Sequence, residues 1–404
     1  MQPTPKLIFP LADRIERISS SATGAVLVEA ERLRAAGVDV VNFGVGEPDF
    51  PTPDHIKQAA VRAIERNLTK YTPTPGIGPL REAVCHWHKR EFGTDYRPAE
   101  SVITVGGKHA IFNALNVLVN EGEEVILPAP YWVSYPDIIR FVGAEPRIVQ
   151  TSASDGFRLR AAHVEAAIGP KTRALLVNSP NNPSGAVVPP DEFERLLGLC
   201  RRHGIWLITD ECYSHFLYGG LEPFSVAALD GAKDQVIVAG SCSKTFAMTG
   251  WRIGFALGPK PVIDAMIKLQ GQSTANPTSI AQYAAIEAFT GPMDAVERML
   301  VEYARRRAAA LEELAKIPGV TCAKPEGAFY VFPDVGGSAR LRALREKNEA
   351  ADTGRIAAEM LSEARVATVA GEAFGAPGHL RISYAIAPER VREGIGRMRE
   401  FLSE

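Results

Sequence analysis

Short runs of apolar, β-branched residues alternate with helix-like stretches through the middle of the chain. Runs of about four to eight apolar residues bounded by Gly, Pro, Asn or Asp are typical of buried strands, and helices between such strands favour a parallel sheet. Helices are predicted over residues 108–119, 191–203 and 295–317. The predicted strands are SVITV, EEVILPAP, RALLVNSP, GIWLITD and QVIVAGSCS.

The C-terminal part of the chain has a different pattern. GAFYVFP and HLRISYAI resemble strands, and helices are predicted over 353–364 and 388–402. This mixture favours a smaller α+β domain beside a larger α/β domain, and the Gly- and Pro-rich segment FGVGEPDFPTP is expected to cross between them. The predicted division is an N-terminal arm with part of the small domain (1–51), a large domain (52–300) and the remainder of the small domain (301–404).

Composition and charge narrow the class of protein. A chain of 404 residues with 46% hydrophobic residues can bury a large core, and its net charge of −2 lacks the basic excess typical of binding to nucleic acid or anionic membranes. No apolar run has the length of a membrane helix and the N-terminus lacks a secretory pattern, so a cytoplasmic location is expected. Five scattered cysteines without CxxC spacing, and no HExxH, predict neither a disulfide framework nor a metal site.

Four of the predicted strands end in polar or glycine residues. Ligands in open parallel sheets bind at the carboxyl ends of the strands, so these residues are expected to converge on one pocket if the strands are parallel neighbours. The residues at these ends are Gly106, Gly107, Lys108, Asn178, Asn182, Asp210, Ser241, Ser243 and Lys244.

The glycine turn before residue 108 suits an anion. Glycines let the backbone approach a phosphate, and the free N–H groups of a helix start favour negative charge. GxxxxGK[ST] and GxGxxG are both absent, so neither a nucleotide hydrolase loop nor a dinucleotide fold is indicated. The alternative is a plain strand-to-helix turn.

Ser241 and Ser243 precede Lys244, and Arg252 follows eight residues later. These groups suit a phosphate with an aldehyde nearby, because a buried lysine amine near other cations is neutral part of the time. The alternative is a surface lysine. Asp210 leaves a buried apolar run and needs a partner, for which a protonated pyridine nitrogen is suited, with Tyr213 in reach of the same ring. The alternative there is a helix cap or a turn aspartate.

Several longer motifs carry a resemblance. The chain resembles class I aminotransferases of fold type I, and most closely the bacterial aspartate aminotransferases. The resemblance implies the cofactor pyridoxal 5′-phosphate (PLP), a large domain with a mostly parallel seven-stranded sheet, and a smaller α+β domain. The motifs are GEPDFPTP, KYTPTPGIGPLREAV, ITVGGKHAIFNAL, PYWVSYP, NSPNNPSGAV, SCSKTFAMTGWRIG and GAPGHLRISYA.

The resemblance also implies cofactor contacts. It implies that PLP forms a Schiff base with Lys244, that Asp210 pairs with the pyridine nitrogen, and that Trp132 stacks on the ring. Tyr213 and Asn182 would hydrogen-bond the ring oxygen. Tyr71 would reach the phosphate of a neighbouring subunit, which implies a homodimer with shared active sites. The residues implied around the phosphate are Gly106, Gly107, Lys108, Ser241, Ser243 and Arg252.

On the substrate side, the resemblance implies that Arg381 binds the α-carboxylate, supported by Asn182, Trp132 and the Gly44 backbone. An arginine presents a planar fork that fixes a carboxylate. Taken alone, Arg381 could instead be a solvated strand residue, Trp132 a core residue and Tyr71 a brace for a proline turn.

Transamination between an amino acid and a 2-oxo acid by a ping-pong mechanism is therefore expected, with aspartate and 2-oxoglutarate as substrates. Many aspartate aminotransferases bind the distal carboxylate with an arginine of the partner subunit, but LQGQSTANPTS, where it is expected, has no arginine. The subgroup that this chain most resembles uses a lysine in the GGK turn instead, so the resemblance implies this role for Lys108. Ser19 stands where prephenate-using relatives have a lysine, which argues against prephenate. The alternatives are an alanine, aromatic or prephenate aminotransferase, a PLP-dependent lyase, or a regulator, although regulators usually add a DNA-binding domain that has no room here.

Overall fold

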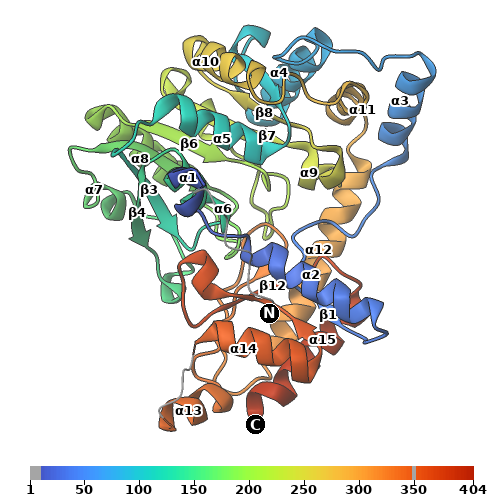
Figure 1. The fold of residues 1–404 in the computed structure, drawn as a ribbon, viewed down its shortest axis with the longest axis vertical. Coiled ribbons are helices and arrows are strands. Elements are labelled where there is room, and N and C mark those ends of the chain that lie inside the picture. Colours follow the sequence, from blue (N-terminus) through green and yellow to red (C-terminus); the bar gives the residue numbers. More distant parts are fainter. Residues whose placement is uncertain (1–10, 348–351) are drawn as a thin grey trace.

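The computed structural model describes residues 11–347 and 352–404 (Figure 1). Its centre is a seven-stranded sheet in the order β2-β8-β7-β6-β5-β3-β4. The five strands from β7 to β4 are parallel, whereas β8 runs antiparallel to both of its neighbours. The mostly parallel seven-stranded sheet is thus confirmed. The strands are β2 (Ser101–Thr104), β3 (Glu124–Ala129), β4 (Glu145–Gln150), β5 (Thr172–Asn178), β6 (Trp206–Asp210), β7 (Val236–Ser241) and β8 (Gly254–Leu257).

Both faces of this sheet are buried, which explains why its strands read as continuous apolar runs. On β5, Leu175 and Val177 join the core cluster that includes residues of α4 and α8, whereas Ala174 and Leu176 join the cluster of α5, α6 and α10. Successive side chains of a strand point to opposite faces, so a two-sided core needs apolar residues at every position. The helices around the sheet are α3 (Asp54–Glu65), α4 (Gly78–Phe92), α5 (Gly107–Leu118), α6 (Ser134–Phe141), α7 (Ala161–Glu165), α8 (Pro190–His203), α9 (Cys242–Thr245), α10 (Lys260–Gly271) and α11 (Ser279–Thr290).

A second group of elements lies beyond the long helix α12 (Asp294–Leu314), in the lower part of Figure 1. β1 (Val41–Asn42) pairs with β10 (Val366–Ala367), which brings an early part of the chain beside a late one. A second small sheet has the order β11-β12-β9. The strands of this sheet and the helices of this group are β9 (Tyr330–Val331), β11 (Val369–Ala370), β12 (Leu380–Ser383), α2 (Ala22–Ala35), α13 (Ala339–Glu346), α14 (Thr353–Glu359) and α15 (Pro388–Ser403). The short helix α1 (Asp13–Glu16) lies against α6 beside the large sheet instead (Figure 1).

Strand β4 was not predicted, and two further details differ from the sequence-based expectation. β2 is not a direct neighbour of the parallel strands, because the unpredicted strand β8 lies between β2 and β7. Two antiparallel steps restore the direction, so the carboxyl end of β2 still points to the same edge as that of β7. The helix predicted over 353–364 ends as α14 at Glu359 and continues as a π-helical turn over Met360–Ala364.

The predicted domain boundaries and cytoplasmic location stay predictions, and the first ten residues of the predicted N-terminal arm lie outside the described residues. Within residues 11–347 and 352–404, every helix is too short or too polar to span a bilayer.

Candidate active site

A cavity of about 320 Å³ opens at the carboxyl edge of the sheet, beside the small sheet that contains β12. Residues from all four predicted strand ends contribute to its wall, so the expected convergence on one pocket is observed. The lining residues are Thr23, Gly46, Gly107, Lys108, Trp132, Tyr135, Asn178, Asn182, Asp210, Cys212, Tyr213, Ser241, Ser243, Lys244, Arg252, Tyr330 and Arg381.

Three of the residues singled out from the sequence do not line the cavity. Gly106 and Gly44 act from just outside it through the contacts described below. Tyr71 is 93% exposed on the protein surface. The lining residues that were missed from the sequence are Thr23, Gly46, Tyr135, Cys212 and Tyr330. Gly46 and Tyr135 stand in motifs that carry the resemblance, GEPDFPTP and PYWVSYP, whereas the local pattern around Thr23 gives no sign of a site.

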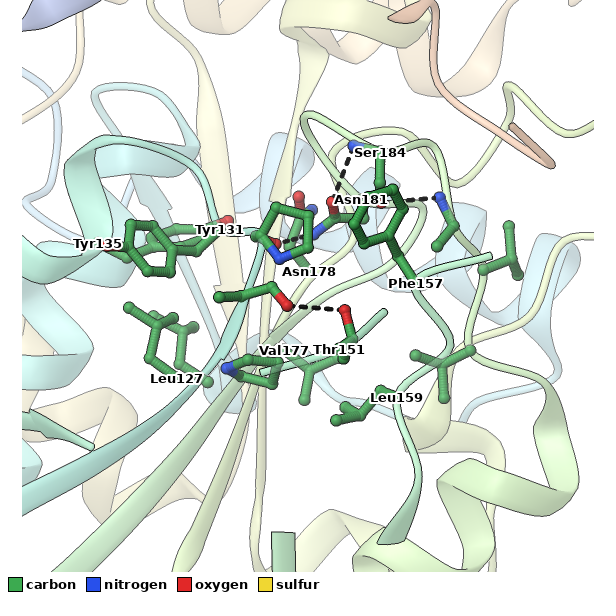
Figure 2. A pocket seen from close by; sticks show the side chains of 17 residues that line it. Leu127, Tyr131, Tyr135, Thr151, Phe157, Leu159, Val177, Asn178, Asn181 and Ser184 are labelled. Atoms are coloured by element: carbon green, nitrogen blue, oxygen red, sulfur yellow. Dashed lines mark hydrogen bonds between the residues drawn. The ribbon is translucent and has the colours of Figure 1, made fainter. Parts of the chain in front are cut away.

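A smaller chamber of about 30 Å³ lies against the cavity and shares Tyr135 and Asn178 with it (Figure 2). Its volume suffices for a single water molecule. The Asn178 amide donates to the Asp210 carbonyl at 3.0 Å, and its side-chain oxygen accepts from the Asn182 backbone N–H at 2.8 Å. Asn178 therefore fixes the loop that carries Asn182 against the end of β6.

Lys244 lies on the short helix α9, directly after β7. Its ammonium nitrogen donates to the Gly46 carbonyl at 2.5 Å. Burial lowers the pKa of the Lys244 amine, because desolvation disfavours its charged form. A lysine in this state is suited to attack a carbonyl carbon.

Asp210 ends β6 and turns its carboxylate into the cavity. One oxygen accepts a hydrogen bond from the Tyr135 hydroxyl at 2.7 Å, and the other accepts from the Cys212 backbone N–H at 3.1 Å. Burial raises the pKa of the Asp210 carboxyl to about 6, although the hydrogen bond from Tyr135 opposes the shift. A buried carboxylate of this kind is stabilised by a cationic partner in the cavity.

The raised pKa predicts how Asp210 affects the cofactor-free protein. Because the folded-state pKa of about 6 exceeds the ordinary value of 3.8 for an aspartate in the unfolded chain, the stabilisation is present below about pH 4 and is lost as the pH rises through 6. Asp210→Asn should therefore raise the free energy of unfolding by about 3 kcal/mol at pH 8 and by much less at pH 4. Urea unfolding at both pH values measures this, with the exposed Asp264→Asn as control. An equal effect at the two pH values would contradict the prediction.

Glycines and hydroxyls at the sheet edge form an anion cradle, made of Gly106, Gly107, Ser241, Ser243 and Arg252. Gly106 has φ +86, and a Cβ there would lie 2.3 Å from the Arg252 guanidinium, so glycine alone allows this approach. α5 begins at Gly107, so the Gly107 and Lys108 N–H groups precede the first hydrogen bonds of the helix, which His109 and Ala110 donate to the Gly106 carbonyl. The Ser241 hydroxyl donates to that of Ser243 at 2.8 Å. Free N–H groups, two hydroxyls and a guanidinium match the needs of a phosphate.

Arg381 is only 2% exposed, so the alternative of a solvated strand residue is wrong. It donates to the Gly44 carbonyl at 2.7 Å and to the Asn182 side-chain oxygen at 3.2 Å. Its Nε finds no hydrogen-bond partner in the part of the chain that the structure describes. The guanidinium lies 4.8 Å from the Tyr330 ring centroid. A buried guanidinium with a spare donor is suited to bind a carboxylate.

Lys108 and Tyr213 also face the cavity. The Lys108 ammonium lies 4.7 Å from the centroid of the Trp132 ring, and desolvation together with Arg252 lowers the pKa of the Lys108 amine. The Tyr213 hydroxyl is 2.9 Å from the Tyr330 hydroxyl, and burial raises the pKa of Tyr213 well above its usual value. Tyr213 therefore stays protonated and can donate a hydrogen bond.

Metal-ligating side chains do not gather in residues 11–347 and 352–404, where no group of three or more His, Cys, Asp or Glu side chains could hold an ion. The groups that give the cavity its chemistry are instead the Lys244 amine, the Asp210 carboxylate, the anion cradle, and the side chains of Lys108 and Arg381.

Comparisons with known proteins agree with this geometry. The protein-family model described as aminotransferase class I and II matches residues 38–398 of this chain. The chain is 42% identical over 393 residues to an aspartate aminotransferase of Geobacillus stearothermophilus, covering 97% of this chain and 98% of the relative. It is 44% identical over 395 residues to an aspartate/prephenate aminotransferase of Thermus thermophilus, covering 97% and 98%.

A solved structure, Thermus thermophilus aspartate aminotransferase with maleate, matches with a TM-score of 0.91 and 43% identity, covering 98% of this chain and 100% of that one. Both the family match and the relatives span nearly the whole chain, so they include the sheet edge and the cavity. This chain therefore belongs to the class I and II aminotransferases, enzymes that transfer an amino group between an amino acid and a 2-oxo acid.

Proposed function

We propose that this protein transfers the amino group of L-aspartate to 2-oxoglutarate and that it uses PLP bound to Lys244. The observation that carries the proposal is that one cavity contains the Lys244 amine, the Asp210 carboxylate and a phosphate-sized anion cradle. The names of the relatives from Geobacillus and Thermus support aspartate as the donor.

The cavity residues fit PLP at each of its functional groups. The buried Asp210 carboxylate needs a cationic partner, which a protonated pyridine nitrogen provides. A Cβ at Gly106 would fill the cradle, in which Ser241, Ser243 and Arg252 would hold the phosphate. When bound, PLP supplies an aldehyde that joins an amine and a ring that accepts the electron pair left on the substrate Cα.

The chain's own residues then divide the work. The Arg381 fork binds the substrate α-carboxylate, with Asn182 and the Gly44 carbonyl holding the guanidinium in place. Lys244 Nζ, with its lowered pKa, is the base that removes the proton from the substrate Cα. With PLP bound, Tyr213 would donate a hydrogen bond to the ring oxygen and Trp132 would pack on the ring face. Together with Arg381, these residues would fix the orientation of the substrate Cα bonds relative to the cofactor.

Lys108 is proposed to select the dicarboxylic substrates, because its side chain lines the same cavity as Arg381. Arg381 would bind the α-carboxylate and Lys108 the distal one. Lys108→Met should lower kcat/KM for aspartate and 2-oxoglutarate by about 10- to 100-fold, the value of a charged hydrogen bond. It should change kcat/KM for alanine less than about threefold. Initial rates with both donors measure the effect, and Lys108→Arg, which keeps the charge, is the matched control.

The wild-type protein provides the test of the reaction itself. Mixing it with aspartate alone should convert the bound cofactor to pyridoxamine phosphate and release one oxaloacetate per site. Low activity on aspartate with high activity on alanine or phenylalanine would contradict the substrate, whereas absence of pyridoxamine phosphate with every donor would favour a lyase.

Tyr71 is proposed to complete the cradle of a second subunit, because its ring is 93% exposed in one chain. Tyr71→Phe should weaken PLP binding by about tenfold, the value of one charged hydrogen bond. Mixing Tyr71→Phe with Lys244→Ala protein under exchanging conditions should give about a quarter of the sites the PLP affinity of the wild type. About half of the dimers are then mixed, and each mixed dimer has one intact site, formed by Lys244 of one subunit and Tyr71 of the other. No restoration would place Tyr71 in its own subunit's site, and a monomeric mass would exclude the dimer.

A further inference from the structure

A buried group of polar side chains lies directly behind Asp210. Glu211, the next residue, is 8% exposed, and His88 on α4 is 1% exposed. The two ring nitrogens of His88 point to different partners, Thr94 on one side and Glu211 on the other. None of these residues lines the active-site cavity or has a part in the reaction described above.

One carboxylate oxygen of Glu211 and the Nδ1 atom of His88 have hydrogen-bond partners. One oxygen of Glu211 accepts hydrogen bonds from the Thr209 hydroxyl at 3.1 Å and the Ser225 hydroxyl at 2.8 Å. His88 Nδ1 lies 2.7 Å from the Thr94 hydroxyl oxygen. The Glu211 carboxylate and the His88 ring are therefore held in fixed positions.

The two atoms that face each other across the pair have no such partners in the described part of the chain. The second oxygen of Glu211 and His88 Nε2 are 3.6 Å apart, and neither has a hydrogen-bond partner in the described part of the chain. Tyr96, 7% exposed, has a buried hydroxyl that also finds none there. An isolated buried carboxylate is strongly unfavourable, whereas an imidazolium facing it at this distance balances its charge.

The surroundings strengthen the interaction. The His88 ring is packed among aromatic rings, with centroids 4.7 Å from Phe92, 6.1 Å from Trp87 and 6.4 Å from Phe255. Few dipoles screen charges in such a place, so the charge of Glu211 acts on its neighbour Asp210. Glu211 is one of the groups that raise the pKa of Asp210.

We propose that His88 is the buried counter-ion of Glu211 and that the two form a positioning pair, which lets Asp210 remain ionised opposite the ring nitrogen of PLP. The inference rests on the proposed cofactor. Without the imidazolium, the negative charge of Glu211 would be uncompensated and would repel the neighbouring Asp210 carboxylate. Asp210 would then take up a proton at a higher pH.

Other ionisable groups surround the pair. Burial raises the pKa of Tyr96 well above its ordinary value and that of Cys212 to about 12, and it raises the pKa of Tyr135 as well. His215 stacks on Trp87 and pairs with Glu91, and the contacts of His215 and Arg90 lower the pKa of Glu91 to about 2. Lys233 and Glu100 pair near Tyr96, and Lys244 faces Asp210 from the cavity.

The test measures PLP affinity against pH for the wild type, His88→Leu, Glu211→Gln and the double variant. The pH at which affinity falls on acidification should move up by about one unit in His88→Leu and down in Glu211→Gln, and return to the wild-type value in the double variant. His86→Leu, an exposed change on the same helix, is the matched control and should cause no shift.

Thermal unfolding of all variants separates this role from a structural one. If His88→Leu fails to fold, His88→Gln, which keeps a polar but neutral side chain, takes its place. A folded His88 variant with the same pH dependence as the wild type, even with a lowered melting temperature, would overturn the inference. Failure of the wild type to bind PLP at any pH would instead overturn the proposed cofactor.

Discussion

Replacing Lys244 with alanine is expected to reduce transamination by more than about 10⁴-fold, because the change removes both the amine that attaches PLP and the base that acts on the substrate Cα. The visible absorption band of the bound cofactor should disappear as well. The fold should persist, since within residues 11–347 and 352–404 the Lys244 side chain makes one hydrogen bond, to the Gly46 carbonyl. Initial rates, absorption spectra and thermal unfolding measure the three effects.

Borohydride reduction of the wild type gives an independent check of Lys244. The reduced cofactor should be found by mass spectrometry on the peptide that contains residue 244, and Lys260→Ala, an exposed lysine paired with Asp264, should label like the wild type. A band that survives in Lys244→Ala, or a label on another lysine, would refute the assignment.

Arg381→Leu is expected to lower kcat/KM for aspartate by about 10²- to 10⁴-fold, since losing one partner of a buried charge pair costs about 2–5 kcal/mol or more. The loss is large because Arg381 is buried, so its removal leaves the substrate carboxylate in a desolvated site without its cationic partner. PLP affinity should change little, because Arg381 contacts Asn182 and the Gly44 carbonyl and lies outside the anion cradle. Steady-state kinetics and cofactor titration measure the two quantities.

Arg381→Lys is the matched control for geometry. It keeps the charge but loses the bidentate fork, so an intermediate loss of kcat/KM is expected. A retained kcat/KM in Arg381→Leu, within about threefold of the wild type, would show that the α-carboxylate binds elsewhere.

The sequence by itself predicted most strands of the main sheet and the edge at which the active-site cavity lies. Continuous apolar runs predicted five of the seven strands, because a strand buried on both faces needs an apolar residue at every position. The polar residues at their ends predicted the pocket, since the carboxyl ends of parallel strands share one edge. β8 was missed because its short run follows the motif that contains Lys244 and Arg252, and β4 because only one of its residues is fully buried.

The tertiary structure decided whatever depends on distant segments. Arg381 follows a strand pattern that reads equally well as a solvated face, and only packing against Tyr330 and Phe374 buries it. Tyr135 reaches Asp210 across 75 positions of sequence, and His88 reaches Glu211 across more. A local pattern reports which face of an element is apolar, but the partner of a buried charge comes from another element. The sequence therefore determined which residues could react, and the fold determined which charges balance them.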